Sequence, residues 1–288
     1  MSSGLATVSK ILSYSCVDGP GNRFVIFLQG CNLSCLACHN PHTIGLCNHC
    51  GECVAACHAN ALSMVDGRIA FDPLNCDQCD ACLVKCPISA NPMVRQFSVV
   101  ELLDLIRPRR PFLNGVTVSG GEATLQLEFV CRLFQAIRND PELAGLSCFV
   151  DSNGQLGASR WKQLLAVTDG VMLDVKAFSE SLHRALTGGS NLPSLQSARV
   201  VQAAGKLYEL RYLLVPGKTD REPEVDALIR FVLALGEDVR VKLNAYQLHG
   251  VRGAARAWEK MPKAGVDAVA RRLRAAGLRN VVTPAVYV

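Results

Sequence analysis

The 288-residue sequence contains no run of about 18 apolar residues, the length that a helix needs to cross a bilayer. Its first ten residues, M-S-S-G-L-A-T-V-S-K, also lack the basic region and the long apolar region of a secretory signal. We therefore expect a cytoplasmic protein that does not enter a membrane. With 49% hydrophobic residues, the chain can still bury one large core and a small inserted module.

The sequence also lacks a long basic segment, although its formal net charge is +5. The one basic run, R-P-R-R-P at 107–111, is short and interrupted by proline, which is typical of a solvated loop. Thiolates that hold metal clusters would bring the charge of the loaded protein close to zero. The sequence therefore gives no indication of nucleic-acid binding.

Cysteine, in contrast, is abundant, with 14 residues. In a secreted protein so many cysteines would indicate disulfides, but C-x2-C arrays without a secretory signal indicate metal. Clusters of this kind are sensitive to oxygen, so we also expect an anaerobic setting.

Three cysteines, Cys31, Cys35 and Cys38, form C-x3-C-x2-C with no fourth cysteine at a matching spacing. Four thiolates saturate an iron–sulfur cube, and structural zinc also takes four ligands. Three thiolates therefore indicate a cluster with one iron open to chemistry. The alternative is a helix with cysteines at i, i+4 and i+7 on one apolar face, which Gly30, Pro41 and the polar residues between them disfavour.

This motif resembles the signature of radical S-adenosylmethionine (SAM) enzymes. Together with D-G-P-G-N-R at 18–23, the stretch G-C-N-L-S-C-L-A-C-H-N resembles the activating enzymes of glycyl radical enzymes. Eight further cysteines follow, which makes the chain most similar to the YjjW group of these activases. The resemblance implies that Asp18 and Arg23 contact the glycine-bearing loop of the partner, although an ordinary loop would explain D-G-P-G alone.

Residues 42–96 contain two tandem runs of the bacterial ferredoxin type, one from Cys47 to Cys57 and one from Cys76 to Cys86. In that fold the fourth cysteine of each run crosses to the other cluster. Cluster A would then use Cys47, Cys50, Cys53 and Cys86, and cluster B would use Cys76, Cys79, Cys82 and Cys57. His58 stands where proline usually follows the fourth cysteine. Paired zinc ribbons are the alternative, but zinc does not require the x3 step.

Outside this insertion, strands alternate with helices, as in a parallel α/β sheet. We expect strands near residues 22–29, 115–118, 146–150, 170–175, 208–215 and 239–245, with V-V-T-P-A-V-Y-V closing the chain. Helices are expected at 124–138 and 158–166, and after a capping box from Ser98 to Glu101. About six βα units are too few for a closed eight-stranded barrel. The family's partial (β/α)6 barrel fits, formed by 1–41 and 97–288 with a two-cluster ferredoxin-like domain at 42–96.

Charged and glycine residues follow several of these strands, at the end of the sheet where ligands gather. Charges that emerge from apolar strands need a partner or a ligand, and a mutual Asp174–Lys176 ion pair is the alternative to ligand binding. By resemblance, Ser119–Glu122 holds the amino group of SAM, and the aspartate and lysine lie near its carboxylate and ribose. The expected SAM-binding residues are His39, Gly120, Gly121, Glu122, Asp151, Asp174, Lys176, Gln247 and His249.

Two details of this site stay open in the sequence. The family places a histidine directly after the aromatic residue of the sixth strand, whereas here Gln247 follows Tyr246 and His249 comes two residues later. Either of the two can face SAM. The family also places a monovalent cation among residues that match Asp151, Met172 and Asp174.

The resemblance implies an enzyme that cleaves SAM reductively and uses the resulting 5′-deoxyadenosyl radical to abstract hydrogen from a glycine of a partner glycyl radical enzyme. The cofactor carries this chemistry, while the protein supplies position and excludes water. We expect the insertion to relay electrons from a flavodoxin or ferredoxin. The alternatives are a radical SAM enzyme acting on a small molecule and a non-catalytic iron–sulfur electron carrier.

Overall fold

The structure is a computed structural model that describes residues 4–285. It contains two compact units, one formed by Met1–Asn32 and Asn40–Leu146 and the other by Leu33–His39 and Ser147–Val288. No helix in the described part of the chain has both the length and the apolar character that a membrane crossing requires.

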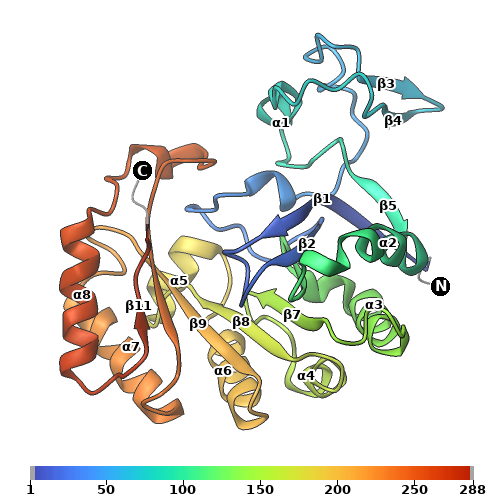
Figure 1. The fold of residues 1–288 in the computed structure, drawn as a ribbon. Coiled ribbons are helices and arrows are strands. Elements are labelled where there is room, and N and C mark those ends of the chain that lie inside the picture. Colours follow the sequence, from blue (N-terminus) through green and yellow to red (C-terminus); the bar gives the residue numbers. More distant parts are fainter. Residues whose placement is uncertain (1–3, 286–288) are drawn as a thin grey trace. The chain divides into compact units, whose positions relative to one another are not determined.

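In the main sheet of the first unit, the strands follow the order β6–β2–β1–β5, and β1, β2 and β5 are labelled in Figure 1. β2 pairs in parallel with β6, and β1 pairs antiparallel with both β2 and β5. The apolar runs correctly predicted β2 and β6, but they missed β1 and β5. The strand bounds are β1 Leu5–Ser15, β2 Arg23–Leu28, β5 Arg95–Ser98 and β6 Gly115–Gly120.

Two helices of the first unit confirm their sequence signals. The capping box forms at α2 (Val99–Ile106), because Ser98 Oγ accepts from Glu101 N at 3.3 Å and Glu101 accepts from Ser98 N at 2.7 Å. The next helix starts as a 3₁₀ turn, η3 (Ala123–Gln126), and continues as α3 (Leu127–Asn139).

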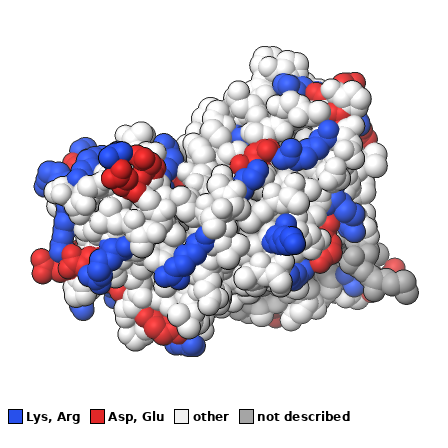
Figure 2. Space-filling model, turned by 90° about the horizontal axis from the view of Figure 1, so that it is seen from below, with Lys and Arg blue, Asp and Glu red and all other residues white. Residues whose placement is uncertain are grey.

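The arginine run at 107–111 is not the loop that we expected, although none of its residues is buried. It forms a 3₁₀ helix, η2 (Arg107–Phe112). Arg107 pairs with Asp104 and Asp140, and Arg109 donates to Ser13 Oγ at 2.9 Å. Arg107 and Arg109 therefore both have partners within the protein. On the face drawn in Figure 2, Lys and Arg residues are interspersed with Asp and Glu residues rather than gathered in one field.

Residues 42–96 belong to the first unit and contain little regular structure. They form η1 (Pro41–Thr43), the hairpin β3 (Leu62–Val65) and β4 (Arg68–Phe71), and the short helix α1 (Ala81–Lys85). Cys53, Leu62, Cys82 and Leu83 make a small core of their own. In Figure 1 this segment stands away from β1 and β2. The boundaries of the inserted domain, at residues 42 and 96, stay a prediction.

The second unit is a parallel sheet in the order β7–β8–β9–β10–β11, with helices between the strands. The strands are β7 Ser147–Ser152, β8 Gly170–Val175, β9 Leu207–Leu214, β10 Val241–Ala245 and β11 Val281–Val282. The helices are α4 Ala158–Leu165, α5 Glu180–Thr187, α6 Leu192–Ala203, α7 Glu222–Leu235 and α8 Lys263–Ala275, with a 3₁₀ turn, η4, at Gly253–Ala257. The four predicted strands at 146–150, 170–175, 208–215 and 239–245 are confirmed as β7 to β10. The predicted closing strand is shorter than expected, and its last residues, 286–288, lie outside the described part.

The register of this sheet places polar side chains on one face of neighbouring strands. Asp151 of β7 is opposite Met172 of β8, and Asp174 of β8 is opposite Arg211 of β9. Directly opposed residues point to the same face of a sheet. The alternate residue Tyr212 points the other way, where its ring packs beside Phe178. One face of the second unit is therefore lined by charged groups close to the carboxyl ends of the strands.

Replacing Ser98 by alanine removes the cap of α2, and we expect the free energy of unfolding to fall by about 1 kcal/mol. A denaturant titration measures this change. Ser159→Ala is the control, because Ser159 is an exposed serine inside α4 with no capping role. Equal stability of the two variants would show that the capping box contributes nothing.

Candidate metal and SAM site

The segment with the three motif cysteines is not helical. Cys31 comes three residues after the end of β2. Gly30 N donates to Thr43 O at 2.8 Å, and Cys31 N donates to Ile44 O at 3.1 Å. The alternative of three cysteines on one helix face is therefore wrong, and the cysteines lie on an irregular loop. Such a loop can turn its thiols toward a common metal.

Cys35 and Cys38 belong to the second unit, where the loop is fastened to the end of α5. Ser34 N donates to Thr187 O and Leu36 N donates to Leu186 O, both at 2.9 Å. Cys38 N in turn donates to Cys35 O at 3.2 Å, which closes a tight turn between the two thiols. The carboxyl end of α5 therefore positions both cysteines.

A lysine faces these two thiols. Lys176 Nζ lies 2.6 Å from Asp174 Oδ2. Burial lowers the pKa of Lys176, but the charges of Asp174 and of the Cys35 and Cys38 thiolates outweigh this, so its pKa lies above the ordinary value. Burial raises the pKa of Cys35 to about 11, and Lys176 acts in the opposite direction. The Asp174–Lys176 ion pair, given above as the alternative to ligand binding, does form, and its lysine places a positive charge beside two thiols that must become thiolates to bind iron.

Arg211 is the charged residue at this face that the sequence analysis missed. Its guanidinium lies 3.2 Å from Asp151 Oδ2, 2.8 Å from Glu209 Oε1 and 2.8 Å from Met172 Sδ. It therefore already contacts two of the three residues that were expected to hold a monovalent cation. The available signal was the alternation Y-E-L-R-Y at 208–212, in which two charges two residues apart interrupt a strand pattern.

The loop after β10 separates the two residues that the sequence left open. Gln247 is partly buried, and its Oε1 is enclosed with no hydrogen-bond partner among the described residues. His249 is exposed. The pKa of His39 lies below its ordinary value because of burial and then of the neighbouring Lys176 and His249. Since a buried acceptor without a donor is costly, Gln247 is the side chain with bonding capacity to offer a ligand.

Gly250 fixes where this loop lies against the cysteine loop. It has φ +74°, and a Cβ at this position would lie 2.0 Å from His39 O. A side chain is therefore excluded both by backbone conformation and by contact with the residue that follows Cys38. The loop of Gln247 and the cysteine loop thus pack backbone against backbone within the second unit.

The Ser119–Glu122 motif lies in the first unit, at the end of β6. A Cβ on Gly121 would lie 2.3 Å from Gly30 O, so this glycine admits the backbone that leads into Cys31. Glu122 is buried, and it caps η3 by accepting from Thr124 N at 3.0 Å. Gly120 has φ +129° and would meet Leu28 backbone atoms. The glycines thus serve close backbone packing beside Cys31.

The D-G-P-G-N-R turn is held together by Arg23, which is fully buried. Its guanidinium donates to Thr117 Oγ1 at 2.6 Å and to Val116 O at 2.7 Å, and Thr117 Oγ1 donates to Asp18 O at 2.7 Å. With its donors used inside the protein, Arg23 supports the turn rather than facing a partner, which corrects its expected role. Asp18 is partly exposed and accepts from Ser15 Oγ at 2.5 Å.

The eight cysteines of residues 42–96 line two small cavities, each with four cysteines. The lining of the first includes Cys47, Cys50, Cys53 and Cys86, which we call set A. The lining of the second includes Cys57, Cys76, Cys79 and Cys82, which we call set B. These are the crossed groups that the sequence predicted. Neither lining contains lysine or arginine.

The backbone repeats itself around the two sets. Left-handed residues occur in pairs, His49 with Gln78 and Asn60 with Ser89, each pair separated by the same number of residues as Cys47 and Cys76. The contacts to sulfur repeat in the same way, since Ala61 N donates to Cys57 Sγ at 3.2 Å and Ala90 N to Cys86 Sγ at 3.3 Å. A left-handed conformation is uncommon for residues other than glycine. Its recurrence indicates that one local fold has been built twice.

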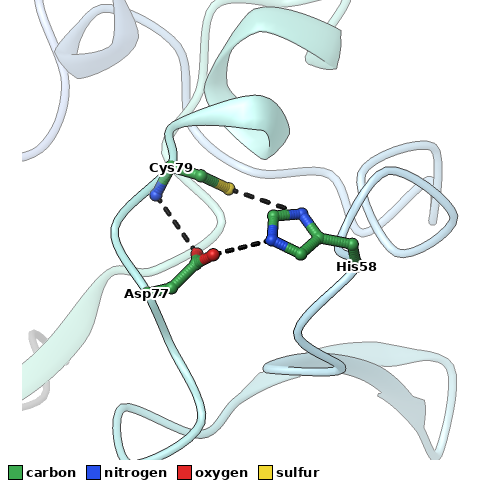
Figure 3. A group of neighbouring side chains, drawn as sticks. All are labelled: His58, Asp77 and Cys79. Carbon is green, nitrogen blue, oxygen red and sulfur yellow. Dashed lines mark hydrogen bonds and ion pairs between the residues drawn. The ribbon is translucent and has the colours of Figure 1, made fainter.

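His58 breaks this symmetry. Its Nε2 lies 2.7 Å from Asp77 Oδ2, and its Nδ1 lies 3.9 Å from Cys79 Sγ (Figure 3). The three side chains are exposed, and their ligand atoms are close enough to hold one metal ion. Cys79 belongs to set B, however, so its thiolate cannot serve both a separate ion and a four-cysteine set. The group is therefore best described as the solvent-facing edge of set B.

Comparison with known proteins identifies the family. The Radical SAM superfamily matches residues 25–229, which is most of the chain. This chain belongs to the radical SAM superfamily. Its relatives include the pyruvate formate-lyase-activating enzyme of Streptococcus mutans, 30% identical over 84% of this chain and 78% of that protein. The isethionate sulfite-lyase activating enzyme of Oleidesulfovibrio alaskensis is 28% identical over 84% of each chain. Within the superfamily, the chain belongs to the activating enzymes of glycyl radical enzymes, and it is therefore an enzyme.

The fold of this radical SAM enzyme is also found in solved structures. A radical SAM methyltransferase from Sphaerobacter thermophilus matches 91% of this chain and 66% of its own length, with a TM-score of 0.57 and 13% sequence identity. This similarity confirms a radical SAM α/β fold with a mostly parallel sheet. Membership of the superfamily implies a [4Fe–4S] cluster and SAM, for which the thiols and charges described above are chemically suited.

Replacing Gly250 by alanine should push the Gln247 loop off His39 and weaken SAM binding. Gly253→Ala is a matched control, because Gly253 also has a left-handed φ, of +62°, but a Cβ there would meet nothing within 4 Å. Backbone strain is then common to both variants, and only the contact differs. Calorimetric titration of the reconstituted proteins with SAM measures the effect. Equal affinities in the two variants would mean that this contact has no part in SAM binding.

Proposed function

We propose that Cys31, Cys35 and Cys38 hold the cluster of this activating enzyme, and that the polar face of β7, β8 and β9 binds SAM beside it. The observation that carries the proposal is the positive charge of Lys176 beside the Cys35 and Cys38 thiols, which it keeps although it also pairs with Asp174. A three-thiolate cluster keeps an open iron, which suits chelation by a small amino acid. When bound, the cluster and SAM use one electron to produce methionine and a radical that takes hydrogen from a glycine of the partner.

The chain's own residues bind and orient the ligand. Lys176 is charged and can pair with the carboxylate of SAM, while Asp174 is left to accept from the ribose hydroxyls. Gln247 offers its unpaired Oε1 as an acceptor, which favours it over the exposed His249. Arg211 holds Asp151 in place from the next strand but one. His39, Gly120, Gly121 and Glu122 complete the proposed binding residues from the loop and from the end of β6.

We further propose that sets A and B each hold a [4Fe–4S] cluster, which places the chain in the ferredoxin-insert group similar to YjjW. The two four-cysteine cavities and the repeated backbone support this assignment. The inserted segment would pass one electron from a reduced flavodoxin or ferredoxin toward the SAM site, with no net change in the insert. The x3 step and the crossed grouping favour iron–sulfur cubes over paired zinc ribbons.

The protein partner in this proposal is a glycyl radical enzyme, as the names of the relatives indicate. Asp18 is the residue that we assign to partner contact, because its side chain is partly exposed. Arg23 and Thr117 hold its turn in place. A small-molecule substrate is the weaker candidate, since none of the described features of this turn is needed to bind one.

The cluster assignment is tested by Cys35→Ala. The wild-type protein, reduced anaerobically with SAM, should yield 5′-deoxyadenosine, and with a glycyl radical enzyme from a neighbouring gene it should give the glycyl doublet in electron paramagnetic resonance. The variant should do neither, while losing only about one third of its iron. Cys131→Ala, which changes a cysteine of α3, should behave as wild type. Full activity of Cys35→Ala would refute the assignment.

Partner contact is tested by Asp18→Asn. We expect the yield of glycyl radical to fall while partner-free cleavage of SAM stays unchanged, because Asp18 lies outside the proposed SAM site. Asp66→Asn is the control, since Asp66 is an exposed aspartate in the β3–β4 turn. The two yields are compared by spin quantitation and by chromatography of 5′-deoxyadenosine. Parallel loss of both products would move Asp18 into the SAM site instead.

A further inference from the structure

We infer that the two cysteine sets have a fixed order: set A is the inner set, joined to the loop of Cys31, and set B is the outer set, where a donor protein delivers the electron. This inference rests on the proposed function of the insert. All of the residues that carry it lie in the first unit.

The first link joins the backbone beside set A to the residues before Cys31. Ala90 N donates to Cys86 Sγ at 3.3 Å, and Ala90 pairs with Gly45 as a parallel bridge. Gly45 N donates to Ser89 O at 3.0 Å, and Gly45 O accepts from Gln29 Nε2 at 2.6 Å. Gln29 is buried, two residues before Cys31. A continuous set of close contacts therefore runs from a set A ligand to the cysteine motif.

A second link reaches set A from the other side. Cys31 N donates to Ile44 O at 3.1 Å, and Cys47 follows Ile44 by three residues. Three residues span at most about 11 Å even when fully extended. Two members of set A, Cys47 and Cys86, are thus tied by short paths to Cys31.

Sets A and B meet through one pair of buried cysteines. Cys53 of set A and Cys82 of set B are 6% and 7% exposed, and both belong to the small core with Leu62 and Leu83. The side of set B at Cys79 is open, since Cys79, His58 and Asp77 are exposed together (Figure 3). Cys50 of set A is exposed as well. Exposure alone therefore does not decide which set is the inner one. The contacts of Gly45 with Ala90, Ser89 and Gln29, which we call the Gly45 junction, do decide it.

The Gly45 junction requires glycine at residue 45. A Cβ on Gly45 would lie 2.2 Å from Ile88 O, a distance that real Cβ atoms do not show. Any side chain at residue 45 would push the 86–90 segment away from the residues that hold Gln29 and Cys31. Electrons balance along this order: one leaves the reduced donor protein, and one is consumed when one SAM is cleaved.

The order is tested by electron paramagnetic resonance of the fully reduced protein with SAM bound, because magnetic coupling between two clusters falls steeply with distance. Cys50→Ala removes a ligand of set A and Cys79→Ala a ligand of set B, both from exposed positions. We expect the signal of the SAM-bound cluster to be broadened in wild type and in Cys79→Ala, and sharp in Cys50→Ala. The reverse pattern, or no difference between the variants, would overturn the order.

Iron analysis separates this inference from the proposed function. Three cubes bring about twelve irons per chain, and each variant should keep about eight. About four irons in wild type would refute the clusters of the insert altogether. Twelve irons with the reverse coupling pattern would refute only the order.

Gly45→Ala keeps every cysteine and tests the junction itself. After SAM is added to the reduced protein, oxidation of the insert clusters, followed by stopped-flow absorbance, should be several-fold slower than in wild type. Gly157→Ala is the control, because a Cβ there meets nothing within 4 Å and its φ is an ordinary −63°. An unchanged rate in Gly45→Ala, with full iron content, would overturn the inference.

Discussion

A buried thiolate needs a positive charge, and this requirement organises the protein. The structure answers it in two ways. Beside Cys35, Lys176 supplies a positive charge from the end of β8. Around sets A and B the cavities contain no lysine or arginine, and backbone N–H groups such as those of Ala61 and Ala90 are the donors to sulfur. In the proposed function, four thiolates in such a cavity would take their positive charge from metal, whereas the loop of Cys35 already has Lys176 beside it.

The same difference explains why the cysteine motif lies on an irregular loop. A helix would fix its thiols on one line and would satisfy its own backbone. Here the backbone donors of Ser34 and Leu36 bond to α5, and the donor of Cys31 bonds to Ile44. The loop is therefore held through its main chain. Gly121 at one end and Gly250 at the other lack a Cβ where one would strike the backbone of Gly30 or His39.

Much of this could be predicted from the sequence, because its signals are local. Apolar runs located β2 and β6 to β10, the spacing of Ser98 and Glu101 predicted the cap of α2, and the cysteine spacing predicted the grouping of sets A and B. The failures all involve partners distant in the chain. The sequence predicts Arg23 to be an exposed residue of a turn, whereas Thr117 and Val116, far away in the chain, accept its hydrogen bonds. The 107–111 run is predicted to be a loop because Asp140 and Ser13, which bind Arg107 and Arg109, are far away in sequence.

Arg211 shows most clearly why such residues are missed. In the sequence it interrupts an apolar strand and has no neighbour of opposite charge except Glu209. In the folded unit, strand register brings Asp174 opposite it, and Asp151 lies on the strand beyond. Burial lowers the pKa of Arg211, but these carboxylates more than compensate and raise it above its ordinary value. The polar face is therefore a network of opposite charges contributed by three strands, and a ligand with both an amino and a carboxylate group can join it through ion pairs of its own.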